Sequence, residues 1–174
     1  LHQAILKYRL ELKDAMFKDF RKHGSEVDLT EIYPAVSEIK HARSHLTTWM
    51  RPKSVNTPLA LFGTSSYIKY APKGVVLILS PWNLPVNLTF GPLVSAVAAG
   101  NCVMIKPSEH TLNTSAVMKK IVVETFDESE VAYFEGEVEM ATALLKLPFN
   151  HIFFTGSPEV GKIVMAAAVK HLAS

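Results

Sequence analysis

Two kinds of hydrophobic pattern follow one another along the chain. In the first part, apolar residues recur every three or four positions over residues 1–22 and again from Ile32 to Met50. This spacing predicts two amphipathic helices, which either pair as a helical hairpin or pack on the rest of the chain. We expect His23-Gly24-Ser25 to stop the first helix. Asp28 with Glu31 resembles a capping box at the start of the second.

A polar connector at residues 52–57 then leads to a predicted β-hairpin. Its strands are expected at residues 59–62 and 66–70, on either side of Gly63-Thr64-Ser65.

From residue 75 onward, short apolar runs alternate with longer stretches of helical pattern. The runs at 75–79, 102–105, 131–134 and 152–154 are nearly continuous, as is typical of strands buried on both faces. Helical stretches follow at 86–99, 111–126, 137–146 and 158–172. This alternation predicts an α/β fold with a doubly wound parallel sheet and right-handed crossovers. We expect three regions: a helical segment at 1–57, the β-hairpin at 58–72 and the sheet domain at 73–174. The chain stops after a helix, where the alternation leads us to expect another strand.

Composition narrows the class of protein. The chain has 174 residues, 48% of them hydrophobic, which is typical of a globular protein. Its net charge of +2, without a basic block, gives no indication of a nucleic acid or an anionic membrane as partner. No apolar run approaches the ~20 residues that span a bilayer. The single cysteine, Cys102, excludes an internal disulfide framework and fits a reducing compartment such as the cytoplasm.

Three polar motifs each follow one of the predicted strands. They are Ser80-Pro81-Trp82-Asn83, Lys106-Pro107-Ser108-Glu109 and the glycine-rich segment that begins at Gly156. In an open α/β sheet, ligands bind outside the carboxyl ends of the strands. The three motifs therefore predict one shared ligand site.

The first motif offers a neutral hydrogen-bond donor. The amide of Asn83 is suited to stabilise an oxyanion without adding a charge, and Trp82 offers a flat apolar wall. The alternative is that Asn83 caps a helix while Trp82 lies in the core.

The second motif offers a pair of opposite charges. Lys106 ends a buried strand, so its ammonium group needs solvent or a partner. The carboxylate of Glu109 accepts hydrogen bonds from ribose hydroxyls and repels a 2′-phosphate, which favours NAD over NADP. NADP stays possible, because Lys106 is able to accept a 2′-phosphate. A surface ion pair is the alternative.

The third motif resembles a phosphate-binding helix start. Gly156 permits a sharp turn, Ser157 is a good N-cap and Pro158 suits the first helical position. The free N–H groups at such a helix end favour an anion. A plain capped helix is the alternative, because the motif is neither G-x-G-x-x-G nor a P-loop.

In order and spacing, the three motifs together resemble the aldehyde dehydrogenase superfamily. The segment Ala98-Ala99-Gly100-Asn101, which precedes Lys106 at the family's spacing, adds to the resemblance. Tyr33-Pro34, Glu38-Ile39-Lys40 and Val160-Gly161-Lys162-Ile163 resemble the class 3 and fatty or coniferyl aldehyde branch.

The resemblance implies an NAD(P)-dependent oxidation of an aldehyde to a carboxylate through a cysteine thiohemiacetal. It implies a Rossmann-like cofactor domain, no metal, and a homodimer in which the hairpin contributes to the contact. Asn83 would be the catalytic side chain that steadies the oxyanion. The implied cofactor-binding residues are Ser80, Pro81, Trp82, Lys106, Ser108, Glu109, Gly136, Gly156, Ser157, Pro158, Glu159, Val160 and Gly161.

We expect the nucleophile and the general base to lie outside this sequence. Family members carry a Glu-Leu-Gly-Gly segment and, later, a cysteine, and the 174 residues contain neither of these. The chain is therefore expected to be an N-terminal portion that is inactive by itself. Cys102, predicted to lie buried within a strand, is a poor nucleophile candidate. His41 and His45 have zinc-like spacing, but a solvated polar face is the better interpretation.

Two other functions stay open. The chain could be a truncated binding module that pairs through its hairpin and an open sheet edge. It could also belong to a relative that reduces acyl phosphates or acyl-CoA on the same scaffold.

Overall fold

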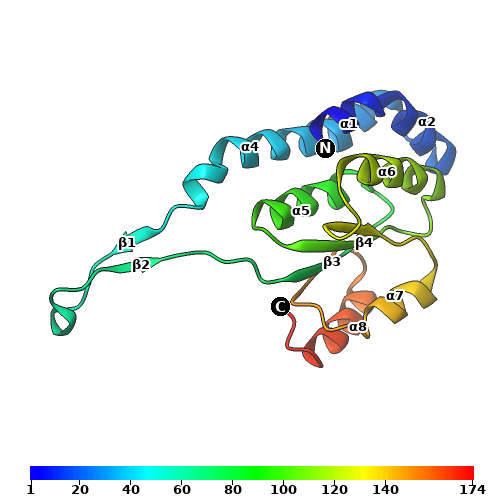
Figure 1. Ribbon diagram of the computed structural model, residues 1–174. Coiled ribbons are helices and arrows are strands. Elements are labelled where there is room, and N and C mark those ends of the chain that lie inside the picture. The colour runs from blue at the N-terminus through cyan, green and yellow to red at the C-terminus, as the bar shows by residue number, and fades with distance from the viewer.

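A sheet of four parallel strands forms the centre of the structure, a computed structural model that describes residues 1–174 (Figure 1). The strands are β3 (Val75–Leu79), β4 (Cys102–Lys106), β5 (Val131–Tyr133) and β6 (His151–Phe154). Their order across the sheet is β5-β4-β3-β6, and every neighbouring pair is parallel. The chain therefore winds outward from β3 to β5 and then returns to the other side of β3. The predicted parallel sheet is confirmed, and its winding reverses between β3 and β6.

Helices cover both faces of this sheet (Figure 1). On one face lie α5 (Asn87–Ala98) and α6 (Leu112–Thr125), and on the other lie α7 (Val138–Leu144) and α8 (Pro158–Val169). Such a two-sided arrangement is the doubly wound α/β fold that the alternation predicted.

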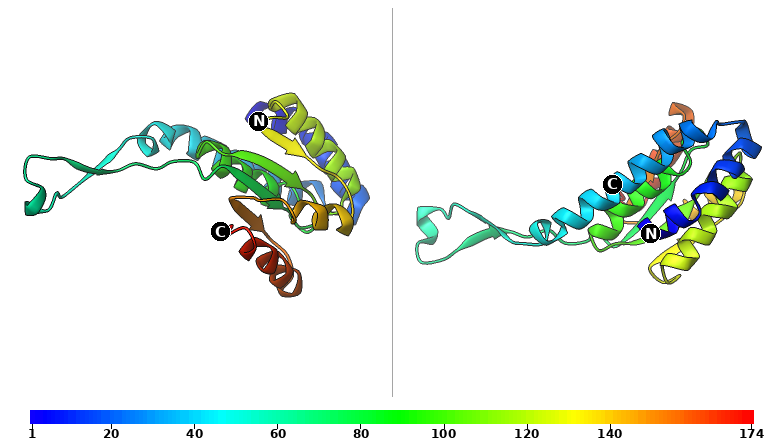
Figure 2. Two further views of the ribbon diagram at one scale, coloured as in Figure 1. Left: turned by 60° about the horizontal axis from the view of Figure 1, so that its bottom comes forward. Right: turned by 90° about the horizontal axis from the view of Figure 1, so that it is seen from above.

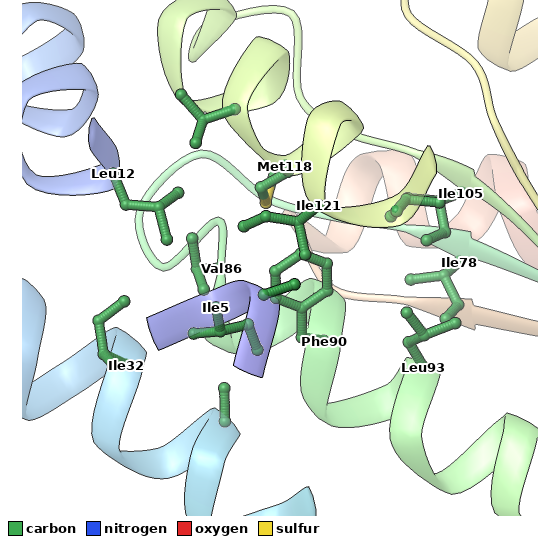
Figure 3. Packing of buried hydrophobic residues seen from close by; sticks show 14 of the residues in the cluster. Ile5, Leu12, Ile32, Ile78, Val86, Phe90, Leu93, Ile105, Met118 and Ile121 are labelled. Carbon is green, nitrogen blue, oxygen red and sulfur yellow. The ribbon is translucent and has the colours of Figure 1, made fainter. Parts of the chain in front are cut away.

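Most of the buried apolar surface lies on the α5 and α6 side of the sheet. Figure 3 shows Phe90 of α5 and Ile121 of α6 in this core, together with Ile5 from the N-terminal helices. This cluster contains 21 buried residues, whereas the cluster on the α7 and α8 side contains five. Burial of hydrophobic area is the main stabilising contribution to folding, so the α5 and α6 side of the sheet contributes most of the stability of the fold.

The N-terminal segment is a chain of helices that packs on this side. It consists of α1 (His2–Lys7), α2 (Arg9–Phe20), α3 (Gly24–Val27), the π-helical turn η1 (Asp28–Ile32) and α4 (Tyr33–Trp49). The helix α2 packs on α6, and α4 packs on α5. The helices therefore lie on the sheet domain, and they do not form a free hairpin. No helix in the structure is both long enough and apolar enough to cross a membrane.

Two local expectations for this segment are wrong. The first helix is interrupted at Tyr8, although it ends close to the predicted stop, at Arg21, which adopts a left-handed φ of 63°. The break spans residues 21–23, and Gly24 already begins α3, where a His23 ring nitrogen accepts a hydrogen bond from the Ser25 N–H. Asp28 and Glu31 form no capping box: they lie inside a continuous helical stretch, and both carboxylates bind distant groups.

Between α4 and β3 the chain leaves the body as a long arm, which two further views show clear of the sheet domain (Figure 2). Here β1 (Lys53–Val55) pairs antiparallel with β2 (Ser66–Ile68). The predicted strand at 59–62 is wrong, because η2 (Leu59–Leu61) is a 3₁₀ turn that follows Pro58. The polar connector supplies the strand instead. An apolar run predicts a strand only where a face can be buried, and Leu59 and Phe62 are 88% and 91% exposed.

Candidate functional site

The carboxyl ends of β3, β4 and β6 meet at one edge of the sheet. Leu79, the last residue of β3, is in register with Lys106 on one side and with Phe154 on the other. The loops that begin there carry the three motifs predicted from the sequence. The structure thus brings residues 80–83, 106–109 and 155–161 to one edge, around the point where the strand order reverses. We call this edge the rim.

The loop after β3 begins with a buried serine. The Ser80 N–H donates to the Lys106 carbonyl at 3.1 Å, and its hydroxyl accepts from Thr89 of α5 at 2.7 Å. Pro81 is half-buried, and Trp82 is 53% exposed, so the alternative that places Trp82 in the core is wrong. The Trp82 ring meets Phe20 of α2 edge to face, with 6.3 Å between ring centroids. This end of β3 is therefore tied to β4, α5 and α2.

One end of the Asn83 side-chain amide makes no hydrogen bond within the chain. Its Oδ1 accepts a hydrogen bond from the Leu84 N–H at 3.0 Å, whereas its Nδ2 has no partner in the chain. The side chain is exposed and does not cap α5, which begins at Asn87. With the oxygen engaged, the amino group is the end that remains available to a ligand.

A buried ion pair lies directly under this loop, and the sequence analysis missed it. The Lys22 Nζ is 2.5 Å from Glu31 Oε1, and the two side chains are 4% and 0% exposed. Lys22 Nζ also donates to the Asn83 carbonyl at 3.2 Å. Glu31 Oε2 accepts from the N–H groups of Val86 and Asn87 at 3.1 and 2.9 Å. Burial raises the pKa of the Glu31 carboxyl, and hydrogen bonds from Lys22, Asn87 and Val86 counteract that rise. No local spacing signals a pair that acts on a loop some fifty residues away.

A second ion pair joins the two charged residues of the loop after β4. Lys106 is buried, and its Nζ is 2.6 Å from Glu109 Oε2, so the interpretation as a plain surface pair fails for the lysine. Partial burial acts to raise the pKa of Glu109, but the hydrogen bond and charge of Lys106 outweigh it and hold this pKa below its ordinary value. The buried Ser108 hydroxyl accepts from the His110 N–H at 3.3 Å and so fixes the turn. The result is an oriented, ionised and partly exposed carboxylate.

The loop after β6 depends on glycine. A Cβ added at Gly156 would lie 2.5 Å from the Phe154 ring, and one at Gly161 would lie 3.4 Å from it. Ser157 caps α8 by accepting from the Val160 N–H at 3.4 Å, and Pro158 is its first residue, as predicted. The residues from Gly156 to Val160 are exposed. The first N–H groups of this twelve-residue helix thus lie at an accessible turn.

Gly136 lies on the loop after β5, one strand beyond β4. Its φ of 148° favours glycine, and a Cβ there would lie 2.8 Å from Met140. It therefore occupies the outer part of the rim, farther along the sheet than Lys106.

Two other candidates lie away from the rim. Cys102 is exposed and is the first residue of β4, so it sits at the opposite end of the sheet; the expectation that it is buried within a strand is wrong. His41 and His45 are exposed on α4, and their rings are in contact at a tilt of 31°, with 4.2 Å between centroids. No group of three or more His, Cys, Asp or Glu side chains is placed to hold a metal ion.

These features fit an adenine dinucleotide. The turn at Gly156 passes too close to the Phe154 ring to accept a Cβ, and it lies next to a helix end that favours phosphate. The Glu109 carboxylate, held by Lys106, is suited to ribose hydroxyls. Asn83 adds an unpartnered donor on the neighbouring loop.

Comparisons with known proteins agree on one family. A model of the aldehyde dehydrogenase family matches residues 1–174. Aldehyde dehydrogenase family 3 member B2 of Mus musculus is 48% identical over 161 residues, which cover 92% of this chain and 34% of the mouse protein. The chain therefore spans about a third of that relative's length.

Solved structures share the fold. The substrate-bound state of Staphylococcus aureus AldH has a TM-score of 0.96 at 45% identity, covering 99% of this chain and 38% of that one. A Mycobacterium tuberculosis aldehyde dehydrogenase complexed with NAD⁺ has a TM-score of 0.84 at 18% identity, covering 99% and 35%. A Streptococcus pyogenes succinic semialdehyde dehydrogenase in complex with NADP⁺ has a TM-score of 0.85 at 16% identity, covering 99% and 38%.

Proposed function

This chain belongs to the aldehyde dehydrogenase family, and on that premise we propose that it is the NAD-binding part of an enzyme that oxidises an aldehyde to a carboxylate. The observation that carries the proposal is the meeting of three loops at the rim, with the loop after β3 between the loop that bears the Lys106–Glu109 pair and the loop after β6. The likeness to class 3 relatives at 48% identity supports it.

In this proposal the rim holds NAD along its length. Lys106 and Glu109 bind the adenosine ribose, with Ser108 shaping their loop. The pyrophosphate lies at the start of α8, where Gly156, Ser157, Pro158, Glu159 and Gly161 form the turn. Val160 and Gly136 flank the adenine, and Ser80, Pro81 and Trp82 form the strand end beneath the nicotinamide half. NAD is preferred over NADP because the ionised Glu109 repels a 2′-phosphate.

The chemical role of the chain is to stabilise negative charge. A bound nicotinamide supplies the oxidant for the reaction. The Asn83 Nδ2 donates to the substrate oxygen as it gains charge, an interaction that is stronger in the transition state than in the ground state. Cys102 lies at the far end of the sheet and Glu109 is engaged by Lys106. The thiol nucleophile and the general base therefore come from outside these 174 residues, and the chain alone oxidises no aldehyde.

We also propose that the arm pairs with a second copy of the chain. Leu59 and Phe62 on its tip are 88% and 91% exposed, and β1 and β2 form a two-stranded sheet with open edges. We also propose the division into regions 1–57, 58–72 and 73–174, in which the end of the first region supplies β1 to the arm. A reducing compartment such as the cytoplasm suits the unpaired Cys102.

Calorimetric titration of the chain with NAD⁺ and NADP⁺ tests the proposal. We expect saturable binding with NAD⁺ the tighter ligand, and we expect Glu109→Gln to narrow the preference by about tenfold, or 1.4 kcal/mol. An added aldehyde should produce no NADH with the chain alone. Absence of NAD⁺ binding, or aldehyde-dependent NADH formation by the chain alone, would contradict the proposal.

A further inference from the structure

The loop that carries Asn83 has little support of its own. Residues 81–86 form bends and turns with no strand partner, and Asn83 is exposed. A donor that stabilises a transition state must stay within a narrow range of positions, so something else has to fix this peptide.

The fixing contacts come from the N-terminal helices. Beyond α2, Arg21 adopts its left-handed conformation, and the next residue, Lys22, is buried. Its ammonium group donates to the Asn83 carbonyl, on the same residue whose side chain bears the free Nδ2. Phe20 contacts Trp82 from the same end of α2.

Glu31 completes the arrangement. Its Oε1 binds Lys22, while its Oε2 accepts two N–H groups at the start of α5, where no side chain of α5 provides a cap. Lys22 thus holds the loop at Asn83 and Glu31 holds it where it enters α5. Val86, at that entry, is fully buried in the main core (Figure 3).

A buried ion pair adds little net stability, because the cost of desolvating two charges offsets much of their attraction. Apolar side chains of similar volume often stabilise a protein equally well. It does specify geometry, because each charged atom here has a defined partner. We propose that Lys22 and Glu31 are positioning residues for the Asn83 amide: they fix the peptide from which Nδ2 projects. The inference rests on the proposed function, in which Asn83 is the oxyanion donor.

The test compares two variants of the chain by ¹⁵N relaxation at Asn83 and Leu84. Lys22→Met with Glu31→Gln removes both charges at nearly constant volume, so no buried charge is left unpaired. Asp28→Asn is the matched control, because Asp28 pairs with Arg9 and Lys13 in the same helical segment and does not touch the loop. We expect order parameters at Asn83 and Leu84 to fall from about 0.85 to below about 0.6 in the double variant and to stay unchanged in Asp28→Asn.

Titration of the same samples with NAD⁺ separates this inference from the proposed function. The ribose and pyrophosphate residues are untouched, so affinity should change less than about twofold. If the unmodified chain does not bind NAD⁺, the proposed function is overturned. An Asn83 that remains ordered in the folded double variant would overturn the positioning role alone.

A measurement on the unmodified chain covers the case in which the double variant fails to fold. The Lys22 ammonium protons should exchange slowly and show nuclear Overhauser contacts to Asn83 or Leu84. Fast exchange without such contacts would overturn the inference.

Discussion

The loops after β3 and β6 lie side by side at the rim but are held in opposite ways. The loop after β6 is built from its own residues: Ser157 caps α8, and Gly156 and Gly161 pass over the Phe154 ring. The loop after β3 is held from far away along the chain, by Lys22 and Glu31.

In the proposed function, this difference corresponds to two tasks. A phosphate-binding turn has to be open and free of side chains, and a glycine-rich helix start meets that need locally. A transition-state donor has to be fixed in position, and an exposed loop achieves that only through long-range contacts. The N-terminal helices therefore support the rim through Lys22 and Glu31, whose side chains are buried.

Removing the Lys22 ammonium group, which supports the β3 loop from the N-terminal segment, should give the largest loss of stability. Lys22→Met leaves the Glu31 carboxylate buried without its partner, which typically destabilises a protein by about 3–5 kcal/mol. Thermal unfolding followed by circular dichroism should show a lower midpoint, by roughly 2–4 °C for each kcal/mol. Adding Glu31→Gln should recover more than half of this loss. A Lys22→Met variant as stable as the wild type would remove the distinction between the two loops.

Removing the Asn83 amide, the proposed hydrogen-bond donor to the oxyanion, should give the second largest effect, on turnover. In an active full-length enzyme that includes this chain, Asn83→Ala should lower turnover by about 10²–10³-fold, because the oxyanion loses a hydrogen bond. NAD⁺ affinity should hold, since the cofactor contacts are unchanged. Asn83→Asp is the size-matched comparison and should be no more active, because a carboxylate repels the developing charge. If turnover in Asn83→Ala stays within about threefold of wild type, the β3 loop does not stabilise the oxyanion through Asn83.

Adding a methyl group at Gly156 should affect only the β6 loop. Gly156→Ala brings a methyl group to 2.5 Å from the Phe154 ring, and overpacking of this kind costs about 1–3 kcal/mol. Calorimetry should show NAD⁺ binding weakened by about tenfold, or 1.4 kcal/mol. Phe154→Leu makes space, so the double variant should bind better than Gly156→Ala alone. Equal binding by Gly156→Ala and wild type would mean that no ligand approaches this turn.

The smallest loss of stability is expected at the partly exposed ion pairs of Asp28 in the N-terminal segment. The Arg9 hydrogen bond, aided by Lys13, lowers the pKa of Asp28 from 3.8 to about 2. A lowered carboxyl pKa gives stability that is present above pH 4 and lost as the pH falls through about 2. Because Asp28 is partly exposed, Asp28→Asn should cost less than about 1 kcal/mol at neutral pH. Urea midpoints at neutral pH and near pH 2 check this, and a loss comparable to that in Lys22→Met would erase the contrast between buried and exposed pairs.

The same contrast explains what the sequence could predict. The four strands, the parallel sheet and the cap at Ser157 were predictable because each signal lies within a few neighbouring residues. The Lys22–Glu31 pair was not, because the loop that it contacts lies far away in sequence and because Asp28 with Glu31 imitates a capping box. The arm was misjudged at residues 59–62 because apolar character there does not coincide with burial.

Titration of ¹⁵N-labelled chain with NAD⁺, followed through backbone amide shifts, tests the shared rim most directly. The account predicts that the largest shifts fall together on residues 80–83, 106–109 and 155–161, with one common affinity. Shifts confined to one of these loops, or centred on the opposite end of the sheet near Cys102, would contradict it.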